Sequence, residues 1–569
     1  MIGGRMPKLF EAVRGYNLAT FAADLVAGIT VGLVALPLAM AFAISSGVPP
    51  EAGLYCAVVA GFLISVLGGS KVQIGGPTGA FVVIIFAIVA EHGFNSLLVC
   101  TVMAGIFLVI LGITGLGSAV KFIPRPVVIG FTNGIAVLIA STQIKDFFGL
   151  QIEDVPGDFS GRIEVIASHL STISIPATLV ALGAMAVVIA CRKFIKRVPG
   201  AIVALLLGTL VVVVLQLPVE TIGTRFGGIP AGLPSFAPPQ FRPDMIMPLL
   251  SPALTVALLG AIESMMSAVV ADRMSGDKHN PNVELVAQGI ANIASPFFGG
   301  LPATGAIART ATNVRSGAKT PVAGIIHALT LLAVLLFAAP LAQYIPLAVL
   351  AAILLVVAYN MGEWKEIPKL LKMPRADICV WLVTFALTVF ADLTLAVEFG
   401  MVLAALLFIH NVSTTTTVSE VTQEYIEDGR LHILQDKYIP DYVSVIRIHG
   451  PFLFGTTESL LSVAERIDAL KPVVIVRLRN MTAIDASGLL ALEEFADKLR
   501  MTGRVMLLCG ARPQPAKLMK QAEFERHIGK NNICPDIDTA LNRAVLHYIT
   551  TSITGKVTHA ASQPVGVHR

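Results

Sequence analysis

Two short stretches, rich in glycine and proline and 226 residues apart, interrupt hydrophobic parts of this chain. The first reads GGPTGAF over residues 75–81, and the second reads GGLPATGAI over residues 299–307. Glycine and proline both disfavour a continuous helix, so each stretch predicts a helix that is broken at membrane depth. Paired interruptions of this kind are typical of secondary transporters built from two structural repeats.

The interrupted helices also indicate the kind of substrate. A helix N-terminus carries unpaired N–H groups and a partial positive charge, which together favour an anion. Two half-helices that point their N-termini at the bilayer midplane therefore predict a central anion site.

The composition indicates an integral membrane protein. Mean hydropathy is +0.78, and only 14% of the residues are charged, against roughly 25% in soluble domains. Counting the two interrupted segments as half-helices, the chain predicts fourteen spans. Their starts lie near residues 23, 51, 77, 97, 122, 174, 200, 248, 284, 303, 321, 346, 376 and 393. Fourteen spans divide into seven plus seven, and a repeat with an odd number of spans must enter the membrane inverted.

Loop charges predict the orientation of the chain. One set of loops is basic: Lys71, Lys121, Arg125, Arg192, Lys193, Lys196, Arg197, Arg315, Lys319, Lys365, Lys369, Lys372 and Arg375. The alternate set is acidic: Glu51, Glu91, Glu153, Asp154, Asp158, Glu164 and Glu220. Because basic loops stay in the cytoplasm, both termini are expected there.

The sequence changes character after His410, and five regions follow from this change. We expect an N-terminal cytoplasmic segment over 1–20, a transmembrane domain over 21–410 and a polar linker over 411–440. A soluble α/β domain follows over 441–550, with strands at 443–448, 473–478 and 505–508 and helices at 456–470 and 489–500. Residues 551–569 lack periodicity and are expected to be disordered.

The motifs resemble those of the SulP anion transporter family. They read DLVAGIT at 24–30, LP at 36–37, GVPP at 47–50, GLY at 53–55 and GPT at 76–78, and a further stretch runs from Gly299 to Thr310. The tail resembles a STAS domain through IDASG at 484–488. With GAIES at 260–264 and AIAR at 306–309, the chain is most similar to the bacterial C4-dicarboxylate uptake members. The resemblance implies a 7+7 inverted repeat, a core domain that moves against a gate domain, and a homodimer.

Arg309 is the first candidate for chemistry, because an arginine at membrane depth is costly unless it faces protein or water. We expect it about 9 Å inside the second half-helix, where its planar fork suits carboxylate or sulfate oxygens; the alternative is a structural ion pair. The expected substrate-binding residues are those of the half-helix starts, together with an aromatic that follows a helix break expected at Pro37. They are Phe42, Thr78, Gly79, Ala80, Thr304, Gly305, Ala306, Ile307, Ala308 and Arg309.

Glu263 is the only charged residue between Leu249 and Val270 and is the candidate for ion coupling. In bicarbonate-transporting relatives an acid here is associated with sodium and a hydroxyl one turn later, which Ser267 would supply. A glutamate combined with an arginine is more similar to the proton-coupled members. We favour protons over sodium. The alternative is a structural carboxylate that is neutralised by burial or locked to Arg309.

The sequence gives only weak signals, or none, for other functional sites. Ser487 matches a position that is phosphorylated in soluble STAS regulators, although a serine at a helix start is more often an N-cap. His327 is a lone histidine that we expect to be packed. The six cysteines are scattered singly, with no metal-ligand spacing. No cofactor, catalytic group or nucleic-acid partner is indicated.

The leading interpretation is a proton-coupled symporter of a C4-dicarboxylate or sulfate, in the inner membrane of a bacterium. A sodium-coupled bicarbonate transporter or a chloride/bicarbonate exchanger is the alternative within the same class. A nucleobase transporter would not need Arg309. A membrane-tethered STAS regulator is the alternative from another class, but a scaffold needs neither buried charge. None of these functions is enzymatic.

Overall fold

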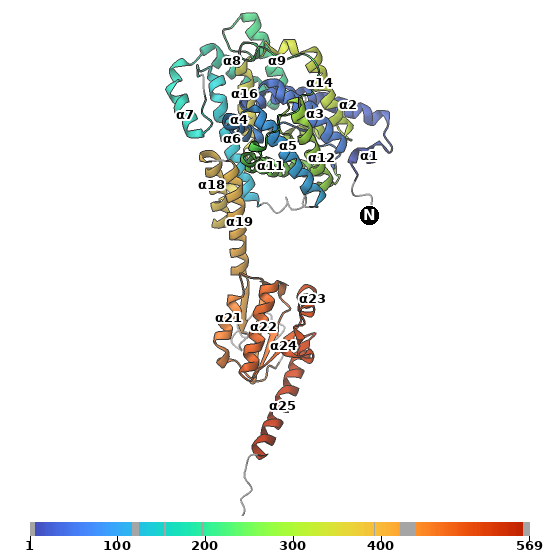
Figure 1. Ribbon diagram of the computed structural model, residues 1–569, viewed down its shortest axis with the longest axis vertical. Coiled ribbons are helices and arrows are strands. Elements are labelled where there is room, and N and C mark those ends of the chain that lie inside the picture. Colours follow the sequence, from blue (N-terminus) through green and yellow to red (C-terminus); the bar gives the residue numbers. More distant parts are fainter. Residues whose placement is uncertain are drawn as a thin grey trace, which may run out of the picture. The chain divides into compact units, whose positions relative to one another are not determined.

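The computed structural model describes residues 6–115, 124–152, 155–194, 199–391, 393–420 and 438–561. The chain forms two compact units, Met1–Ala404 and Ala405–Arg569, which we call the membrane unit and the C-terminal unit (Figure 1). Their boundary falls a few residues before the one expected after His410. Five of the loop charges used above, Lys121, Glu153, Asp154, Lys196 and Arg197, lie outside the described residues.

A helix lies at each of the fourteen predicted spans. Those of the first half are α2 (Leu18–Ser45), α3 (Pro50–Leu67), α4 (Gly79–His92), α5 (Phe94–Ile113), α6 (Arg125–Phe148), α8 (Ile175–Phe194) and α9 (Gly200–Leu215). Those of the second half are α11 (Pro243–Ser275), α12 (Pro281–Ala294), α13 (Ile307–Arg315), α14 (Val322–Phe337), α16 (Leu347–Met361), α18 (Arg375–Phe390) and α19 (Leu393–Thr415). Six helices within the described residues are long and apolar enough to span a membrane.

The described residues also hold short helices between the spans. They are α1 (Lys8–Val13), α7 (Phe159–Ser168), α10 (Ile222–Phe226), α15 (Ala339–Ala342) and α17 (Ile367–Leu370). The break expected at Pro37 is wrong, because α2 continues through this residue to Ser45. Proline removes one N–H donor, and the packing of the buried residues around it outweighs that loss.

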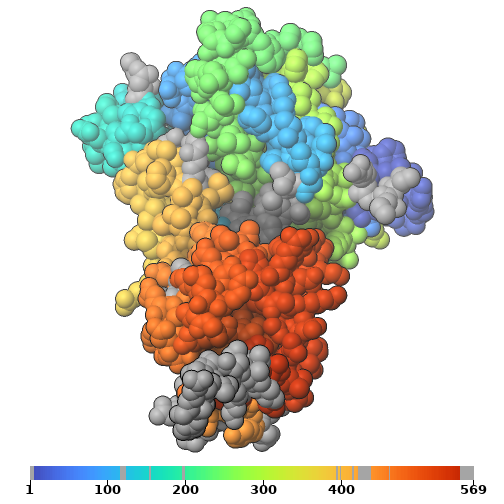
Figure 2. Space-filling view, turned by 60° about the horizontal axis from the view of Figure 1, so that its bottom comes forward, coloured from blue at the N-terminus to red at the C-terminus, as the bar shows by residue number. Residues whose placement is uncertain are grey.

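The spans divide into two bundles, each of which takes matching helices from both halves of the chain. We call α2–α5 with α11–α14 the core bundle, in which α5 packs on α12 and α2 on α14. Figure 2 shows light-blue segments of the first half lying against green segments of the second half. We call α6, α8 and α9 with α16, α18 and α19 the gate bundle, in which α6 packs on α16 and α18. This is the architecture of two interlocked seven-helix repeats.

The C-terminal unit is an α/β domain. Its strands are β3 (Thr417–Glu420), β4 (Val443–Phe452), β5 (Val473–Arg477), β6 (Met481–Ile484), β7 (Val505–Cys509) and β8 (Ile533–Cys534). They follow the order β3-β4-β5-β7-β8, with β6 also paired to β4, and all pairs are parallel except β3 with β4. The helices are α21 (Glu458–Glu465), α22 (Ala486–Met501), α23 (Pro513–Gln521), α24 (Glu525–Ile528) and α25 (Ile537–Ala561).

Two expectations about the tail need correction. The segment 411–440 is not simply a linker, since α19 runs on to Thr415 and β3 pairs with β4. Helix α25 continues to Ala561, past Thr551, where a tail without regular structure was expected. Residues 562–569 lie outside the described part of the chain. Strand β3 was missed because its four residues carry little pattern, and only pairing with β4 stabilises them.

Candidate anion-binding site

The two interrupted segments meet in the middle of the core bundle. Strand β1 (Gly75–Gly76) pairs antiparallel with β2 (Thr304–Gly305), so that Gly76 lies opposite Thr304. Half-helix α4 starts directly after β1, and half-helix α13 starts directly after β2. Antiparallel pairing of equivalent strands is what an inverted repeat produces, and the ladder brings the starts of the two half-helices close together. A common anion site at these starts stays a prediction.

The detailed equivalence of the two segments differs from the one that the sequence suggests. Helix α4 starts at Gly79 after Thr78, whereas α13 starts at Ile307 after Ala306. Gly79 and Ile307 are 228 residues apart, and so are the paired Gly76 and Thr304. The two TGA sequences, 226 residues apart, are therefore not equivalent helix starts. Helix α4 begins at the glycine of its TGA sequence, whereas α13 begins two residues after the glycine of its own. The best match between the sequences therefore differs by two residues from the match between the structures.

This shift places Thr304 and Gly305 inside the ladder. The Thr304 hydroxyl is fully buried, donates to the Gly260 carbonyl oxygen at 2.9 Å and shares a 2.7 Å hydrogen bond with Ser264 Oγ. The Gly305 N–H donates to the same Ser264 Oγ at 3.2 Å. The N–H of Ala306 donates to the Ile74 carbonyl oxygen at 2.8 Å. These hydrogen bonds fasten the start of α13 to α11 and to the residue just before the first interrupted segment, and they use the Thr304 hydroxyl and the N–H groups of Gly305 and Ala306 in this conformation.

Arg309 lies in the first turn of α13, nearer the helix start than expected. Its side chain is 3% exposed, and Nη2 donates to the Pro77 carbonyl oxygen at 2.6 Å. The Nη1 atom has no partner among the described residues, and a Cβ added to Gly76 would stand 2.7 Å from it. Glycine at 76 therefore makes room for a guanidinium between the two interrupted segments.

His327 on α14 is the residue whose setting the sequence did not reveal. The ring is fully buried, and neither nitrogen has a partner among the described residues. Gly61 of α3 lies between His327 and the ladder. A Cβ added to Gly61 would lie 3.1 Å from the Gly75 carbonyl oxygen and 3.7 Å from His327 Cε1. His327 thus lies beside the ladder that Arg309 also adjoins. Only the fold brings α14 to this place, and no local motif marks it.

Glu263 on α11 is joined to the other half-helix. Thr78 Oγ1 donates to Glu263 Oε2 at 2.8 Å. No ion pair joins Glu263 to Arg309 within the part of the chain that the structure describes, so the expected alternative of a locked pair is wrong for this conformation. The role of Ser267 as a second group of the coupling site stays a prediction. Ser267 is buried and shares a 2.9 Å hydrogen bond with the Thr310 hydroxyl.

A narrow cavity of about 40 Å³ brings together some of the predicted residues. Glu263 lines it together with Ala80 of α4 and Ile307 of α13, both of which the sequence predicted. Its other walls come from both bundles: Val127, Val128, Phe131, Thr132, Ile135, Leu259, Ile262, Met266, Met361 and Met401. The cavity has room for only a few water molecules. Ala308 is exposed and is not part of this lining.

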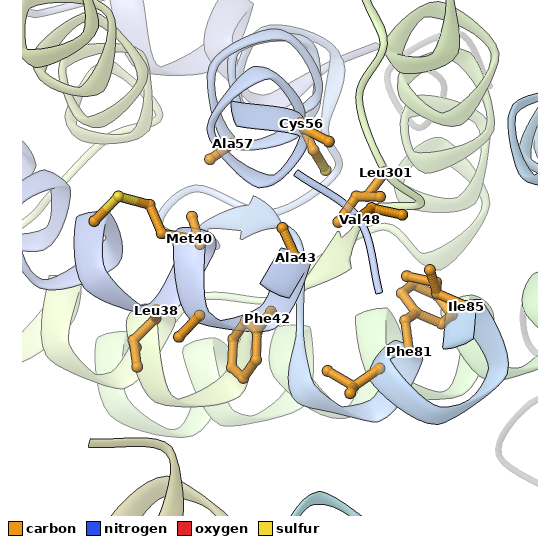
Figure 3. Close-up of a cluster of buried hydrophobic side chains, with 14 of the residues drawn as sticks. Leu38, Met40, Phe42, Ala43, Val48, Cys56, Ala57, Phe81, Ile85 and Leu301 are labelled. Carbon is orange, nitrogen blue, oxygen red and sulfur yellow. The ribbon is translucent and has the colours of Figure 1, made fainter. Parts of the chain in front are cut away.

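Phe42 closes the start of α4. A Cβ added to Gly79 would stand 3.2 Å from Phe42 Cε1, 3.1 Å from Ile139 Cδ1 and 2.7 Å from Met361 Sδ. Phe42 belongs to the buried cluster that also contains Phe81 of α4 (Figure 3). The expected aromatic therefore lies at a half-helix start, packed in this conformation between the two bundles.

Ser487 does not cap its helix. The N-cap of α22 is Asp485, whose Oδ1 accepts from the Gly488 N–H at 2.8 Å while Oδ2 accepts from the Phe454 N–H at 3.0 Å. Ser487 is exposed in the first turn of the helix, and its side chain makes no capping hydrogen bond there. A role in regulation stays a prediction.

Comparison with known proteins assigns the chain to a family. The model of the Sulfate permease family matches residues 21–384, and that of the STAS domain matches residues 435–540. The chain belongs to the sulfate permease family. It is a membrane transporter and not an enzyme, and its two units correspond to the transmembrane domain and the STAS domain. The resemblance to SulP transporters is thereby confirmed.

Individual relatives support the same assignment. The chain is 44% identical to the putative sulfate transporter YvdB of Bacillus subtilis, over 91% of this chain and 97% of that protein. It is 30% identical to the bicarbonate transporter BicA of Picosynechococcus, over 92% of this chain and 94% of the relative. The solved transmembrane domain of a cyanobacterial BicA is 33% identical, with a TM-score of 0.60 over 68% of this chain and 98% of that domain. Murine Slc26a9 in the inward-facing state shares the fold, with 17% identity and a TM-score of 0.84 over 96% and 94% of the two chains.

Proposed function

We propose that this transporter moves a C4-dicarboxylate or sulfate across the bacterial inner membrane by symport with protons. The single observation that carries the proposal is the ladder of β1 with β2, which brings two helix N-termini and the buried Arg309 to one place. Two helix dipoles and a guanidinium favour a substrate with two negative charges. The name of the relative YvdB supports sulfate, and the resemblance of the AIAR motif supports the dicarboxylate.

Glu263 is the residue that we assign to the coupling proton. It lies in a cavity with almost wholly apolar walls, and Thr78 supplies its one side-chain hydrogen bond. A carboxyl group in such a setting can alternate between a neutral and an ionised form as an anion enters and leaves. Thr78 stands at the N-cap position of α4, and its hydroxyl goes to Glu263 rather than to the helix, so a change at Glu263 reaches the residue at the start of a half-helix.

The motion that we propose is an elevator-like displacement of the core bundle against the gate bundle. Two observations support this proposal: the cavity that Glu263 lines has walls from both bundles and is too small for a dicarboxylate, and Phe42, Ile139 and Met361 pack around Gly79 at the start of α4. Separation of the bundles would make room for the anion. We place both termini in the cytoplasm on the strength of the basic loops. By resemblance to the family we expect a homodimer within the lipid bilayer.

Bicarbonate is the second candidate, because relatives that are 30–33% identical are named as bicarbonate transporters. One experiment separates the candidates. Purified protein in liposomes is supplied with labelled succinate, sulfate or bicarbonate under an imposed proton or sodium gradient. Accumulation of succinate or sulfate driven by protons supports the proposal. Sodium-driven bicarbonate uptake without a response to protons would replace it.

A further inference from the structure

Arg162 of α7 is a buried guanidinium far from the half-helix starts. It is 1% exposed, Nη1 donates to Ser141 Oγ at 3.0 Å, and Nη2 donates to the Gly157 carbonyl oxygen at 2.8 Å. The buried Nε atom has no partner among the described residues. A buried charge with an unused donor is costly and calls for an explanation.

No carboxylate neutralises this cation within the part of the chain that the structure describes. Asp158 is the N-cap of α7, and its Oδ2 accepts from the Gly161 N–H at 2.7 Å; its charge lies near Arg162 without forming an ion pair. Glu164, two residues after Arg162, is exposed. Arg225 provides a contrast, since it is paired with both Asp146 and Glu220. Arg162 is thus a permanent positive charge without an ion pair among the described residues, and such a charge attracts anions.

The position of Arg162 links the two bundles. Its guanidinium lies over the ring of Phe86, 5.5 Å from the centroid, and Phe86 belongs to α4 of the core bundle. Its partner Ser141 belongs to α6 of the gate bundle. A second contact crosses between the same bundles two residues further along α6, where Gln143 Nε2 donates to Ser45 Oγ at 2.9 Å. Arg162 therefore lies on a seam that must open if the bundles move apart.

The seam leads to the anion site. Phe86 follows Gly79 by seven residues, which corresponds to about 10 Å along α4. We call the side of the membrane unit at which α7 lies the α7 face (Figure 1). The part of α4 that Arg162 covers therefore lies between this face and the start of the half-helix.

We propose that Arg162 is an anion-binding residue at the α7 face, which receives the transported dicarboxylate or sulfate when α4 moves away from it. Movement of Phe86 uncovers the guanidinium, and the fork then pairs with two oxygens of the anion. The inference rests on the proposed anion transport. It adds a second binding position, reached before the half-helix starts.

A charge-rescue experiment tests this inference. Arg162→Cys is made in a parent that lacks the six native cysteines, and uptake of labelled succinate and sulfate is measured at low anion concentration. We expect uptake to fall at least about tenfold. Modification with a cationic aminoethyl thiosulfonate should restore part of it, and an anionic sulfonatoethyl reagent should not. Excess anion should slow both modifications, because it occupies the same position.

Arg242→Cys is the matched control. Arg242 is an exposed arginine immediately before α11, and α8 and α9 return the chain to the α7 face there. Arg242→Cys also removes one positive charge, but from the exposed surface. Uptake should stay within about twofold of the parent with either reagent. Equal responses of Arg162→Cys to the two reagents would show a structural role and overturn the proposal.

A second variant keeps the test decisive if the cysteine variant is unstable. Arg162→Gln retains amide donors for Ser141 and Gly157 but removes the charge. Its uptake should fall about tenfold at low anion concentration and recover when the concentration is raised. Uptake equal to that of the parent would overturn the proposal. A parent that carries no anion at all would instead contradict the proposed function itself.

Discussion

Arg309 Nη2 donates a 2.6 Å hydrogen bond to the carbonyl oxygen of Pro77, 232 residues earlier in the chain. The cation of the second half-helix is thereby held on the loop that leads into the first. A carbonyl oxygen is a neutral partner, so the positive charge is oriented without being cancelled. The relationship explains how one arginine can serve both halves of an inverted repeat.

The first prediction follows from this contact. Arg309→Ala should abolish anion uptake, and Arg309→Lys should recover little, because an ammonium cannot donate to Pro77 and to an anion in one plane. Initial uptake rates of protein in liposomes, normalised to the amount inserted, provide the measurement. Arg315→Ala, at the exposed end of the same helix, is the control and should transport normally. Full activity of a stably inserted Arg309→Ala would exclude the anion-binding role.

The second prediction concerns coupling. Glu263→Gln can still accept the hydrogen bond from Thr78, so the fold should persist while proton-driven accumulation is lost. Counterflow exchange of anion should survive, because it needs no net proton movement. Thr78→Ser keeps the hydroxyl and should leave both activities unchanged. If the Gln variant still concentrates its substrate in response to a proton gradient, another group carries the proton.

The third prediction separates the two glycines that the sequence treats as equivalent. Gly79→Val meets flexible side chains, above all Met361, and should slow transport in a folded protein. Gly305→Val meets the Gln73 amide and the Ser264 backbone and should destabilise the fold by about 1–3 kcal/mol. Thermal unfolding alongside uptake distinguishes the two effects. Gly183→Val is the control, since nothing lies within 4 Å of its Cβ position.

The fourth prediction concerns access to the site. In a parent without native cysteines, cysteines placed at Ala80 and Ile307 should react with a small water-soluble thiol reagent, and substrate should slow both reactions, since both positions line one cavity. A cysteine at Thr304 should not react, because this position is fully buried. Reaction rates with and without substrate provide the measurement. Protection at only one of the two lining positions would contradict a common site.

The fifth prediction concerns the STAS domain. Burial raises the pKa of the Cys509 thiol to about 12, so roughly 0.01% of it is thiolate at pH 8. Alkylation at that pH should leave Cys509 unmodified in the native protein, and labelling should appear only after denaturation. Mass spectrometry of the labelled peptides measures this. Rapid labelling of native Cys509 would mean that β7 opens readily.

Sequence patterns were sufficient for the spans and for the meeting of the interrupted segments. Hydrophobic length, loop charge and paired glycine–proline interruptions are local or repeated signals, and they predicted α4 and α13 to within a few residues. They did not predict that Thr304 belongs to a strand, because a two-residue β ladder has almost no sequence pattern. They also overestimated the tendency of Pro37 to break its helix, since the packing around α2 stabilises a continuous helix.

What the sequence by itself determined is the class of molecule: a helical membrane transporter in two repeats, with an α/β tail and a buried glutamate and arginine. The tertiary structure alone decided the partners of those charges. Glu263 meets Thr78 rather than Arg309, His327 comes to lie beside the ladder, and Arg162 lies over Phe86. The physical reason is that these contacts join helices distant in the chain, and their geometry depends on how whole bundles pack, which no local pattern encodes.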